Sequence, residues 1–227
     1  MTKISVKVFP PDGLTRPRRG KAFLGISLYN RMAISPLAFR AVFDWVATNV
    51  GGADLFIGDH LHRHNYQAFD GMAETAAIGQ ALRDRDELAA RLSGFLAAGR
   101  WPPAAIMSAS PLYQNPTFPD RLSRFRKQYG SDPAFKRLID DAVDAFLARK
   151  HPDQVVNQET RDHCVAYQLE ELVLFELLVE QGYSTLIYAG AQLPIMKSIV
   201  SGHVDGASDA LRTLALIELR VSGGHTA

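Results

Sequence analysis

Short apolar runs recur along the chain and are separated by longer segments with helical spacing. Three of these runs, Lys21–Ser27, Asp54–Ile57 and Ala104–Met107, are bounded by glycine, proline or polar residues. Two more, Ser184–Tyr188 and Thr213–Val221, lie nearer the C-terminus. Short, continuously apolar runs of this kind predict strands that are buried on both faces.

Apolar residues at helical spacing fill the intervals between the predicted strands. The first helix is predicted over Pro36–Asn49, because serine followed by proline is a typical helix start and Gly51-Gly52 is a typical stop. The same reasoning predicts helices over Asp70–Ala98, Asp120–Tyr129, Pro133–Arg149 and Gln158–Gly182.

Strands that alternate with helices favour an α/β fold, with a parallel sheet covered by helices on both faces. In such sheets ligands bind outside the carboxyl ends of the strands. Ser27, Asp59 and Tyr188 each lie at the end of a predicted strand, so we expect them to converge on one edge. We expect a single domain over residues 1–227, with flexible ends at residues 1–20 and 222–227.

The composition is typical of a soluble globular protein. Of the 227 residues, 47% are apolar and 22% are charged, and the formal net charge is +1. With so small a net charge, the protein has no overall electrostatic field that would attract nucleic acid or a membrane surface. The single cysteine, Cys164, excludes an internal disulfide framework, and no apolar run reaches the ~18 residues of a membrane span. With no signal-peptide pattern in the sequence, we expect a cytoplasmic protein without membrane contact.

A serine and a distant tyrosine–glutamate pair are the most informative polar residues. Ser27 is either a turn residue that bonds a neighbouring amide or a nucleophile. It is not part of a Gly-x-Ser-x-Gly elbow, because position 29 is tyrosine. Tyr167 and Glu171 are one helical turn apart and share a face of a helix that is apolar nearly all round. Glu171 therefore needs a partner, structural or chemical, or its pKa rises.

Three histidines, at positions 60, 62 and 64, follow Asp59. Their spacing matches neither a zinc-protease helix nor a zinc finger. We interpret residues 59–65 as a polar loop at the end of a strand and predict no metal site. The chain also lacks the glycine-rich dinucleotide fingerprint and a Walker motif, so no cofactor is predicted.

Basic residues gather in three places, which are either solvated faces or surfaces for a phosphate backbone. The first is a loop with Arg16, Arg18, Arg19 and Lys21, the second is a helix with Arg121, Arg124, Arg126 and Lys127, and the third is a mixed-charge segment with Arg83, Arg85 and Arg91.

Taken in order, these residues resemble the cyclodipeptide synthases, which make diketopiperazines from two aminoacyl-tRNAs. The resemblance extends over residues 21–221 and rests on Gly25-Ile26-Ser27 with Asn30, Asp54–Asn65 with Asp59, Tyr167-x-x-x-Glu171 with Phe175, and Tyr188. It implies a Rossmann-like, doubly wound fold similar to the catalytic domain of class I aminoacyl-tRNA synthetases, without their ATP-binding signatures.

The resemblance also implies roles for single residues. Ser27 would accept the first aminoacyl group in a ping-pong reaction. A second aminoacyl-tRNA would donate its amine to give a dipeptidyl enzyme, and intramolecular attack would release the cyclic product. Tyr167 and Glu171 would hold the first ammonium group, with Glu171 as the proton acceptor when the second amine attacks. Tyr188 would relay a proton during ring closure, and Asn30 would anchor the aminoacyl end.

Further expectations concern binding. We expect Phe23, Gly25 and Leu174 to border the side chain of the first aminoacyl group, which would then be apolar or compact. We expect Asp59 to help to position the substrate. Ala189 departs from the family, which has glutamine, histidine or proline after the strand tyrosine. We expect two aminoacyl-tRNAs as partners and a monomer or weak homodimer. Residues expected to contact tRNA are Arg83, Arg85, Arg91, Arg121, Arg124 and Lys127.

Three alternatives remain open at this point. Ala189 is compatible with an aminoacyl-tRNA-dependent transferase that passes its acyl group to another amine. The same fold also suits a non-catalytic tRNA-binding module. A serine hydrolase would need a histidine base such as His60 or His62.

Overall fold

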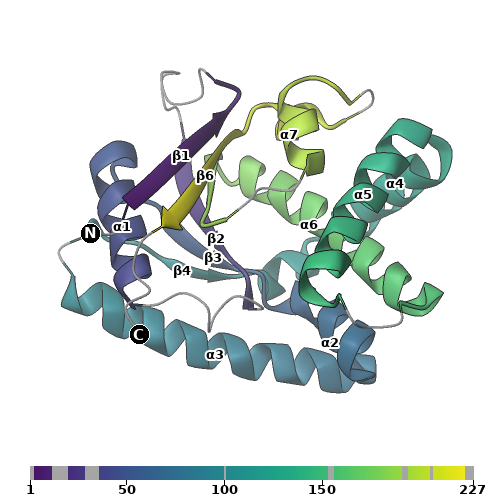
Figure 1. The fold of residues 1–227 in the computed structure, drawn as a ribbon, viewed down its shortest axis with the longest axis horizontal. Helices are drawn as coiled ribbons and strands as arrows, with labels where there is room; N and C mark the ends of the chain where they lie inside the picture. Colours follow the sequence, from purple (N-terminus) through teal and green to yellow (C-terminus); the bar gives the residue numbers. More distant parts are fainter. Residues whose placement is uncertain are drawn as a thin grey trace.

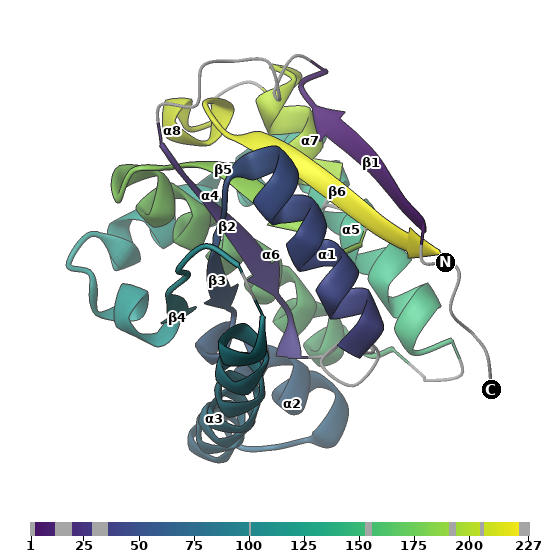
Figure 2. The same cartoon turned by 90° about the vertical axis from the view of Figure 1, so that its left-hand side faces the viewer.

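In the computed structural model, one six-stranded sheet lies between two layers of helices (Figures 1 and 2). The structure describes residues 3–11, 20–28, 36–99, 101–152, 156–190, 194–204 and 207–222. The strands are β1 (Lys3–Phe9), β2 (Lys21–Ile26), β3 (Asp54–Ile57), β4 (Ile106–Ser108), β5 (Tyr183–Tyr188) and β6 (Ala215–Ser222). The helices are α1 (Pro36–Val50), α2 (Arg63–Asp70), α3 (Glu74–Ala98), α4 (Phe118–Ser131), α5 (Pro133–Lys150), α6 (Gln158–Glu180), α7 (Pro194–Val200) and α8 (Asp209–Arg212), with 3₁₀ helices η2 (His60–His62) and η3 (Ser110–Gln114).

The strand order β1-β6-β5-β2-β3-β4 is that of a doubly wound fold. From β2 the chain adds β3 and β4 on one side, then crosses over and adds β5 and β6 on the other, always in parallel. The order therefore reverses between β2 and β5, and a reversal of this kind opens a crevice at the carboxyl edge. The predicted α/β class is confirmed.

The side chains of the strands alternate between two hydrophobic cores. Phe23, Leu186 and Leu216 face the side covered by α4 to α8, whereas Leu24 and Ile187 face α1 and α3. Figure 2 shows α1 lying along one face of the sheet, with α5, α6 and α7 behind it. Helix α6 is buried on nearly all sides because α2, α4 and α5 pack on its outer surface.

The N-terminal segment differs from the expectation of a flexible end. Lys3–Phe9 forms strand β1, which pairs antiparallel with β6 along its whole length. The alternation of Ile4 and Val6 with exposed polar residues is typical of an antiparallel strand with one solvated face. The expectation of flexibility is wrong for this part of the chain, and the sheet is parallel except at this edge. Residues 223–227 lie outside the described part.

The segment after β3 also differs from its interpretation as a polar loop. Residues 60–62 form η2, and Arg63–Asp70 forms helix α2. His62, Arg63, His64 and Asn65 are all buried, so internal hydrogen bonds and ion pairs replace the solvent contacts of a loop. Helix α3 therefore begins only at Glu74.

Helix α6 was predicted within two residues of its observed bounds. The side chain of Asn157 caps its start by accepting a hydrogen bond from Thr160 N at 2.8 Å. Gly182 follows its end with a φ of 91°, a backbone conformation that favours glycine. Among the residues that the structure describes, no helix is both long and apolar enough to cross a membrane.

Candidate active site

Three predicted site residues meet at the carboxyl edge of the sheet. Ser27 directly follows β2, Tyr188 is the last residue of β5, and Asp59 comes shortly after β3. These strands are neighbours, with β2 in the middle. Ser27 and Tyr188 therefore stand on the two sides of the point where the strand order reverses, at the edge on which they were expected to converge.

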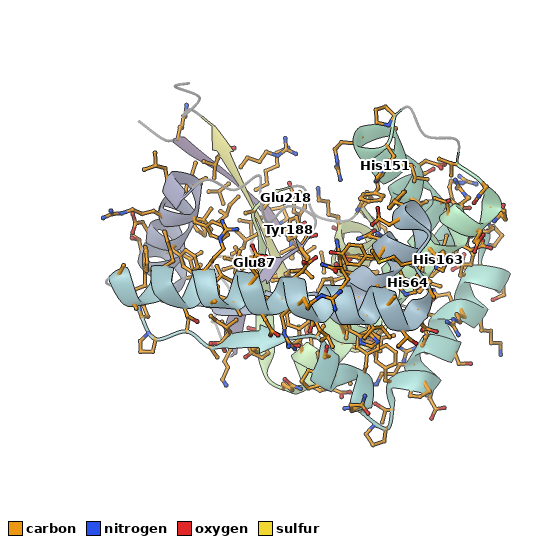
Figure 3. All side chains as sticks on the ribbon, turned by 90° about the horizontal axis from the view of Figure 1, so that it is seen from below. His64, Glu87, His151, His163, Tyr188 and Glu218 are labelled. Atoms are coloured by element: carbon orange, nitrogen blue, oxygen red, sulfur yellow. The ribbon has the colours of Figure 1, made fainter. Side chains whose placement is uncertain are left out.

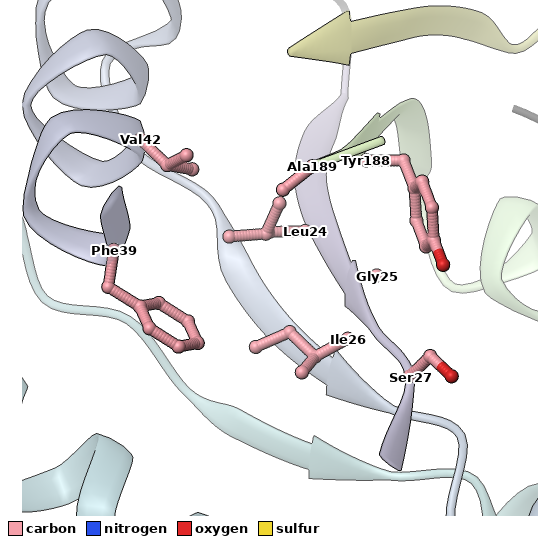
Figure 4. Close-up of a pocket in the computed structure, with 8 residues that line it drawn as sticks. All are labelled: Leu24, Gly25, Ile26, Ser27, Phe39, Val42, Tyr188 and Ala189. Atoms are coloured by element: carbon pink, nitrogen blue, oxygen red, sulfur yellow. The ribbon is translucent and has the colours of Figure 1, made fainter. Parts of the chain in front are cut away.

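Helix α6 brings the tyrosine–glutamate pair onto Ser27. The side chains of Ser27 and Tyr167 share a hydrogen bond, and Tyr167 interacts electrostatically with both Glu171 and Tyr188. Figure 4 shows the hydroxyl groups of Ser27 and Tyr188 on the same side of the two strands, away from Phe39. Four residues from three separate segments of the chain thus form one cluster, and Ser27 within it is only partly buried.

Glu171 is the unusual acid of this cluster. The residue as a whole is partly exposed, but its Oε2 atom is fully buried and accepts no hydrogen bond from the described residues. Burial raises the pKa of Glu171 to about 8. The side chain is therefore mostly protonated at neutral pH in the free protein, and it exchanges its proton in the range that suits a general acid or base.

Tyr167 remains a neutral hydroxyl group at physiological pH. Burial raises the pKa of Tyr167 well above its usual value, and the nearby Glu171 and Tyr188 raise it further. The hydrogen bond with Ser27 acts in the opposite direction but does not reverse the shift. Tyr167 is therefore suited to hold hydrogen-bonding groups in place rather than to act as a base.

Asp59 supports the edge of the sheet from inside. Its carboxylate is fully buried and accepts hydrogen bonds from Ser108 Oγ at 2.6 Å, Ala109 N at 2.7 Å and Ser110 Oγ at 2.7 Å. Arg85 Nη1 lies 3.4 Å from Oδ2. Asp59 thereby fastens the segment after β4 to the end of β3, and its expected part in positioning the substrate stays a prediction.

A second carboxylate, Glu170, lies next to Glu171 on α6 and was missed by sequence reasoning. Arg63 Nη2 donates to its Oε1 at 2.8 Å, and Tyr113 Oη donates to its Oε2 at 2.8 Å. His64 Nε2 lies 3.1 Å from Oε1 but without the alignment of a hydrogen bond. The only sequence signal was a second acid on a helix that is apolar nearly all round.

Glu170 and Glu171 differ in their state of ionisation because their surroundings differ. Burial acts to raise the pKa of Glu170, but the contacts with His64 and with Arg63 outweigh it, so that the pKa falls to about 2. Burial lowers the pKa of His64, so its imidazole is neutral at pH 7 and Arg63 supplies the compensating charge. Adjacent acids with separated pKa values divide the roles: Glu170 is a fixed anion and Glu171 exchanges its proton.

The histidines after Asp59 have structural partners. His62 Nδ1 shares a hydrogen bond with Asn65 Nδ2 at 2.9 Å. The ring of His60 lies against Tyr113, with 4.2 Å between the ring centroids. Within the described ranges, no group of three histidine, cysteine, aspartate or glutamate residues is arranged to hold a metal ion.

Only part of the surface that was expected to contact the first aminoacyl side chain is accessible. Gly25 lies beside Tyr188, whose Cδ2 would be 3.4 Å from a Cβ atom at position 25. Phe23 and Leu174, in contrast, are fully buried in the core. The ring of Phe23 packs against those of Phe56 and Phe175, at centroid distances of 6.0 and 5.9 Å. The two side chains are therefore inaccessible to a substrate in this structure, which corrects the expectation. Asn30 lies outside the described residues.

A small, mainly apolar pocket lies on the α1 side of β2 and β5 (Figure 4). Its lining residues are Leu24, Gly25, Ile26, Ser27, Phe39, Val42, Tyr188 and Ala189. The small side chain of Ala189 forms part of this wall, directly after Tyr188.

Two of the arginines expected to contact tRNA form ion pairs within the protein. Arg124 Nη2 donates to Glu176, a fully buried carboxylate on α6, and Arg121 Nη1 lies 3.4 Å from the same group. Arg121 also pairs with Glu180 at 2.6 Å. An isolated buried carboxylate is costly, so these two arginines compensate Glu176 and do not form a simple phosphate-binding face.

The remaining basic positions differ in their exposure. On α3, Arg83 and Arg91 are exposed, whereas Arg85 is partly buried and contacts Asp86 at 2.7 Å as well as Asp59. On α4, Lys127 is exposed. The loop with Arg16, Arg18 and Arg19 lies outside the described residues.

The protein therefore has a doubly wound α/β fold. At the point where the strand order reverses lies a cluster of hydroxyl groups together with one carboxylic acid of raised pKa, Glu171. The family model of cyclodipeptide synthases matches residues 15–205. The chain belongs to this family, whose members are tRNA-dependent enzymes that form cyclodipeptides. A comparison with curated protein sequences found no match.

Solved structures of the same family share the fold. A cyclodipeptide synthase from Fluoribacter dumoffii is 20% identical with a TM-score of 0.81, covering 99% of this chain and 100% of that one. A Mycobacterium tuberculosis protein described as related to type I tRNA synthetases is 17% identical with a TM-score of 0.69, covering 97% and 94%. The synthase from Candidatus Glomeribacter gigasporarum, solved bound to Phe-tRNA, is 20% identical with a TM-score of 0.66, covering 91% and 90%.

Proposed function

We propose that this protein joins two aminoacyl groups from tRNA into a cyclic dipeptide through an ester on Ser27. The observation that carries the proposal is the cluster itself: Ser27 is hydrogen-bonded to Tyr167, and Glu171 beside it has a buried oxygen without a hydrogen-bond partner among the described residues. Membership in the cyclodipeptide synthase family supports the reaction class.

In the first step, Ser27 Oγ attacks the ester carbonyl of an aminoacyl-tRNA. The new Oγ–acyl bond replaces the bond to the ribose oxygen, and the serine proton passes to that ribose oxygen as the tRNA leaves. An aminoacyl ester is already activated, so an oriented hydroxyl suffices without a histidine base. This agrees with the structural partners of His60 and His62, which are Tyr113 and Asn65.

The ammonium group of the bound aminoacyl residue lies against Tyr167 and Glu171. A buried carboxylic acid without a partner gains most from a neighbouring cation, which favours its ionised form and lowers its pKa. An α-ammonium group has a pKa of about 7.7–8.0, close to the value of about 8 for Glu171 in the free protein. Beside the bound ammonium group, Glu171 is ionised and can accept the proton that the amine loses when it attacks.

The second step forms the peptide bond. A dipeptidyl enzyme results only if the amine on the Ser27-bound residue attacks the ester of the second aminoacyl-tRNA. Attack by the amine of the second aminoacyl-tRNA, the direction expected above, would release Ser27 and leave the dipeptide on tRNA, so that expectation is corrected. Glu171 accepts the proton that the attacking amine loses, and the second tRNA leaves with its ribose hydroxyl restored.

In the last step, the free amine of the dipeptide attacks the Ser27 ester and closes the ring. Ser27 Oγ leaves and takes up a proton. Tyr188, which interacts with Tyr167 across the cluster, relays this proton. The surfaces proposed to guide tRNA toward the site include the exposed Arg83, Arg91 and Lys127.

Product analysis of intact cells tests the proposal. Cells that express the protein should release a cyclic dipeptide detectable by mass spectrometry, and cells that express Ser27→Ala should not. Purified protein should also retain a labelled aminoacyl group as an ester that hydroxylamine removes. If the wild-type protein binds aminoacyl-tRNA but never carries this ester, the Ser27 route is wrong.

Ala189 favours one second candidate, a transferase that passes the acyl group to a different amine. The residue after Tyr188 lines an apolar pocket and offers no polar side chain for ring closure. In this case the Ser27 ester would form, but no cyclic dipeptide would appear. A non-catalytic tRNA-binding module would show neither.

A further inference from the structure

Helix α6 carries two acids side by side near the catalytic cluster, and only Glu171 takes part in the proposed reaction. The other acid, Glu170, is 2% exposed and accepts hydrogen bonds from Arg63 and Tyr113. Arg63 is the first residue of α2, and Tyr113 lies in η3. Glu170 therefore joins α6 to two segments that are distant from it in sequence.

Both partners of Glu170 are fixed at the sheet edge on which Ser27 stands. Helix α2 follows β3 by way of η2, and η3 follows β4. Arg63 Nη1 also donates to the carbonyl oxygen of His60 in η2 at 3.0 Å. The guanidinium group of Arg63 lies over the ring of Tyr113, 5.3 Å from its centroid. The two donors are therefore held against each other and against the ends of β3 and β4.

The contact between α2 and α6 near Glu170 is polar and directional. His64 Nε2 lies 3.1 Å from Glu170 Oε1, and the ring of His64 lies 5.9 Å from that of His163 on α6 (Figure 3). The rest of α6 is apolar nearly all round, and apolar contacts have no preferred direction. Buried ion pairs and hydrogen bonds do have one, and they can select one register between two elements. The rotation of α6 about its axis is therefore set in part by Glu170.

A change in this rotation would move Tyr167 and Glu171 together. Side-chain ends lie about 5–6 Å from a helix axis, so a rotation of about 10° displaces them by about 1 Å. Hydrogen bonds between hydroxyl groups tolerate only a few tenths of an ångström, so the bond between Tyr167 and Ser27 would break. A displacement of about 1 Å at a reacting group can cost about a hundredfold in rate.

We infer that Glu170 is a positioning residue: its bonds to Arg63 and Tyr113 hold α6 at the rotation that brings the catalytic cluster together. This inference rests on the proposed function, because it concerns how the cluster that performs that reaction is assembled. Glu170 acts through the helix and not by contact with a substrate, because both of its carboxylate oxygens already accept hydrogen bonds from the protein.

Single-turnover acylation of Ser27 tests the inference. Wild type and Glu170→Gln are mixed with aminoacyl-tRNA over a range of concentrations, at a temperature at which circular dichroism shows both to be folded. The rate at saturation should fall about tenfold in the variant. The half-saturating concentration should stay the same, because a buried side chain adds nothing to the RNA-binding surface. Acylation of Glu170→Gln at the wild-type rate would overturn the inference.

The matched control is Glu176→Gln. Glu176 is a fully buried carboxylate on the same helix and pairs with Arg124 of α4, so the control loses the same kind of contact and leaves those of Glu170 intact. It should acylate at about the wild-type rate, and an equal fall in both variants would refute a specific role of Glu170. If Glu170→Gln does not fold, Arg63→Met/Glu170→Gln removes both charges together and should show the same fall in rate.

A second measurement does not depend on turnover. In protein with ¹³C-labelled tyrosine rings, the signal of Tyr167 is identified by its absence from Tyr167→Phe. This signal should shift or broaden in Glu170→Gln and stay in place in Glu176→Gln. An unchanged Tyr167 signal in Glu170→Gln would contradict the inference. If wild type forms no ester but its Tyr167 signal responds to Glu170→Gln, the proposed chemistry is wrong and the positioning of α6 by Glu170 stands.

Discussion

The high pKa of Glu171 predicts a specific dependence of stability on pH. The unfolded chain releases the Glu171 proton near 4.5, whereas the folded protein keeps it until about pH 8. Between these values the unfolded state binds fewer protons, so folding stability falls as pH rises. Glu171→Gln removes the titration and keeps nearly the same shape. The variant should therefore gain stability relative to wild type as the pH increases.

The size of this change in stability follows from the pKa shift of Glu171. Each pKa unit corresponds to 1.36 kcal/mol. The free energy of unfolding of the wild type, relative to that of Glu171→Gln, should therefore fall by about 3 kcal/mol between pH 5 and pH 8. Above about pH 8 both states are ionised and the difference becomes constant. Glu171 is partly exposed, so water can stabilise its ionised form and reduce the effect. A fall in the free energy of unfolding of about 1.5 kcal/mol would therefore still agree with the structure.

Urea denaturation of wild type and Glu171→Gln at pH 5 to 9 measures this difference. Glu87→Gln is the control, because Glu87 is an exposed glutamate on α3 (Figure 3) and should show a flat difference. A difference for Glu171→Gln that stays flat, or that decreases toward high pH, would mean that the carboxyl group is solvated or paired. The assigned role of Glu171 as a buried proton acceptor would then be wrong.

Three further predictions concern other parts of the structure. Tyr167→Phe should lower the rate of Ser27 acylation about ten- to a hundredfold in single-turnover assays, because the hydroxyl that positions Ser27 is lost; an unchanged rate would contradict this role. Arg63→Met should destabilise the protein by about 3–5 kcal/mol in urea, since it leaves buried Glu170 without its cation, and Glu170→Gln in the same protein should restore much of the loss. Phe23→Ala should cost about 3–5 kcal/mol by thermal or urea denaturation, because Phe23 fills the core; a loss below 1 kcal/mol would mean that the ring borders open space.

The elements that were predicted well depend on local information. Strand β3 was predicted with its observed bounds, and α6 within two residues, because apolar runs, capping residues and glycine stops act over a few positions. The convergence of Ser27 and Tyr188 was also predictable, since parallel strands place their carboxyl ends on one edge. The high pKa of Glu171 followed from an acid on a helix that is apolar nearly all round.

The elements and contacts that were missed depend on partners far along the chain. Strand β1 forms only because β6, some 200 residues later, offers an edge in the correct register. Residues 60–65 are helical and buried because Glu170 on α6 binds Arg63. The pairing of Arg124 with Glu176 likewise depends on how α4 packs against α6.

Periodicity in a sequence indicates which face of an element is apolar, because neighbouring side chains on one helix or strand report on the same environment. It does not indicate which element covers that face or which charge meets another across it. The local pattern therefore carried the fold class, the edge that holds the site and the acid at position 171. Packing between distant elements decided that Phe23 belongs to the core, that Arg121 and Arg124 neutralise Glu176, and that Glu218 of β6 lies in register with Tyr188. Such contacts arise from the summed geometry of many elements, and no short stretch of residues encodes them.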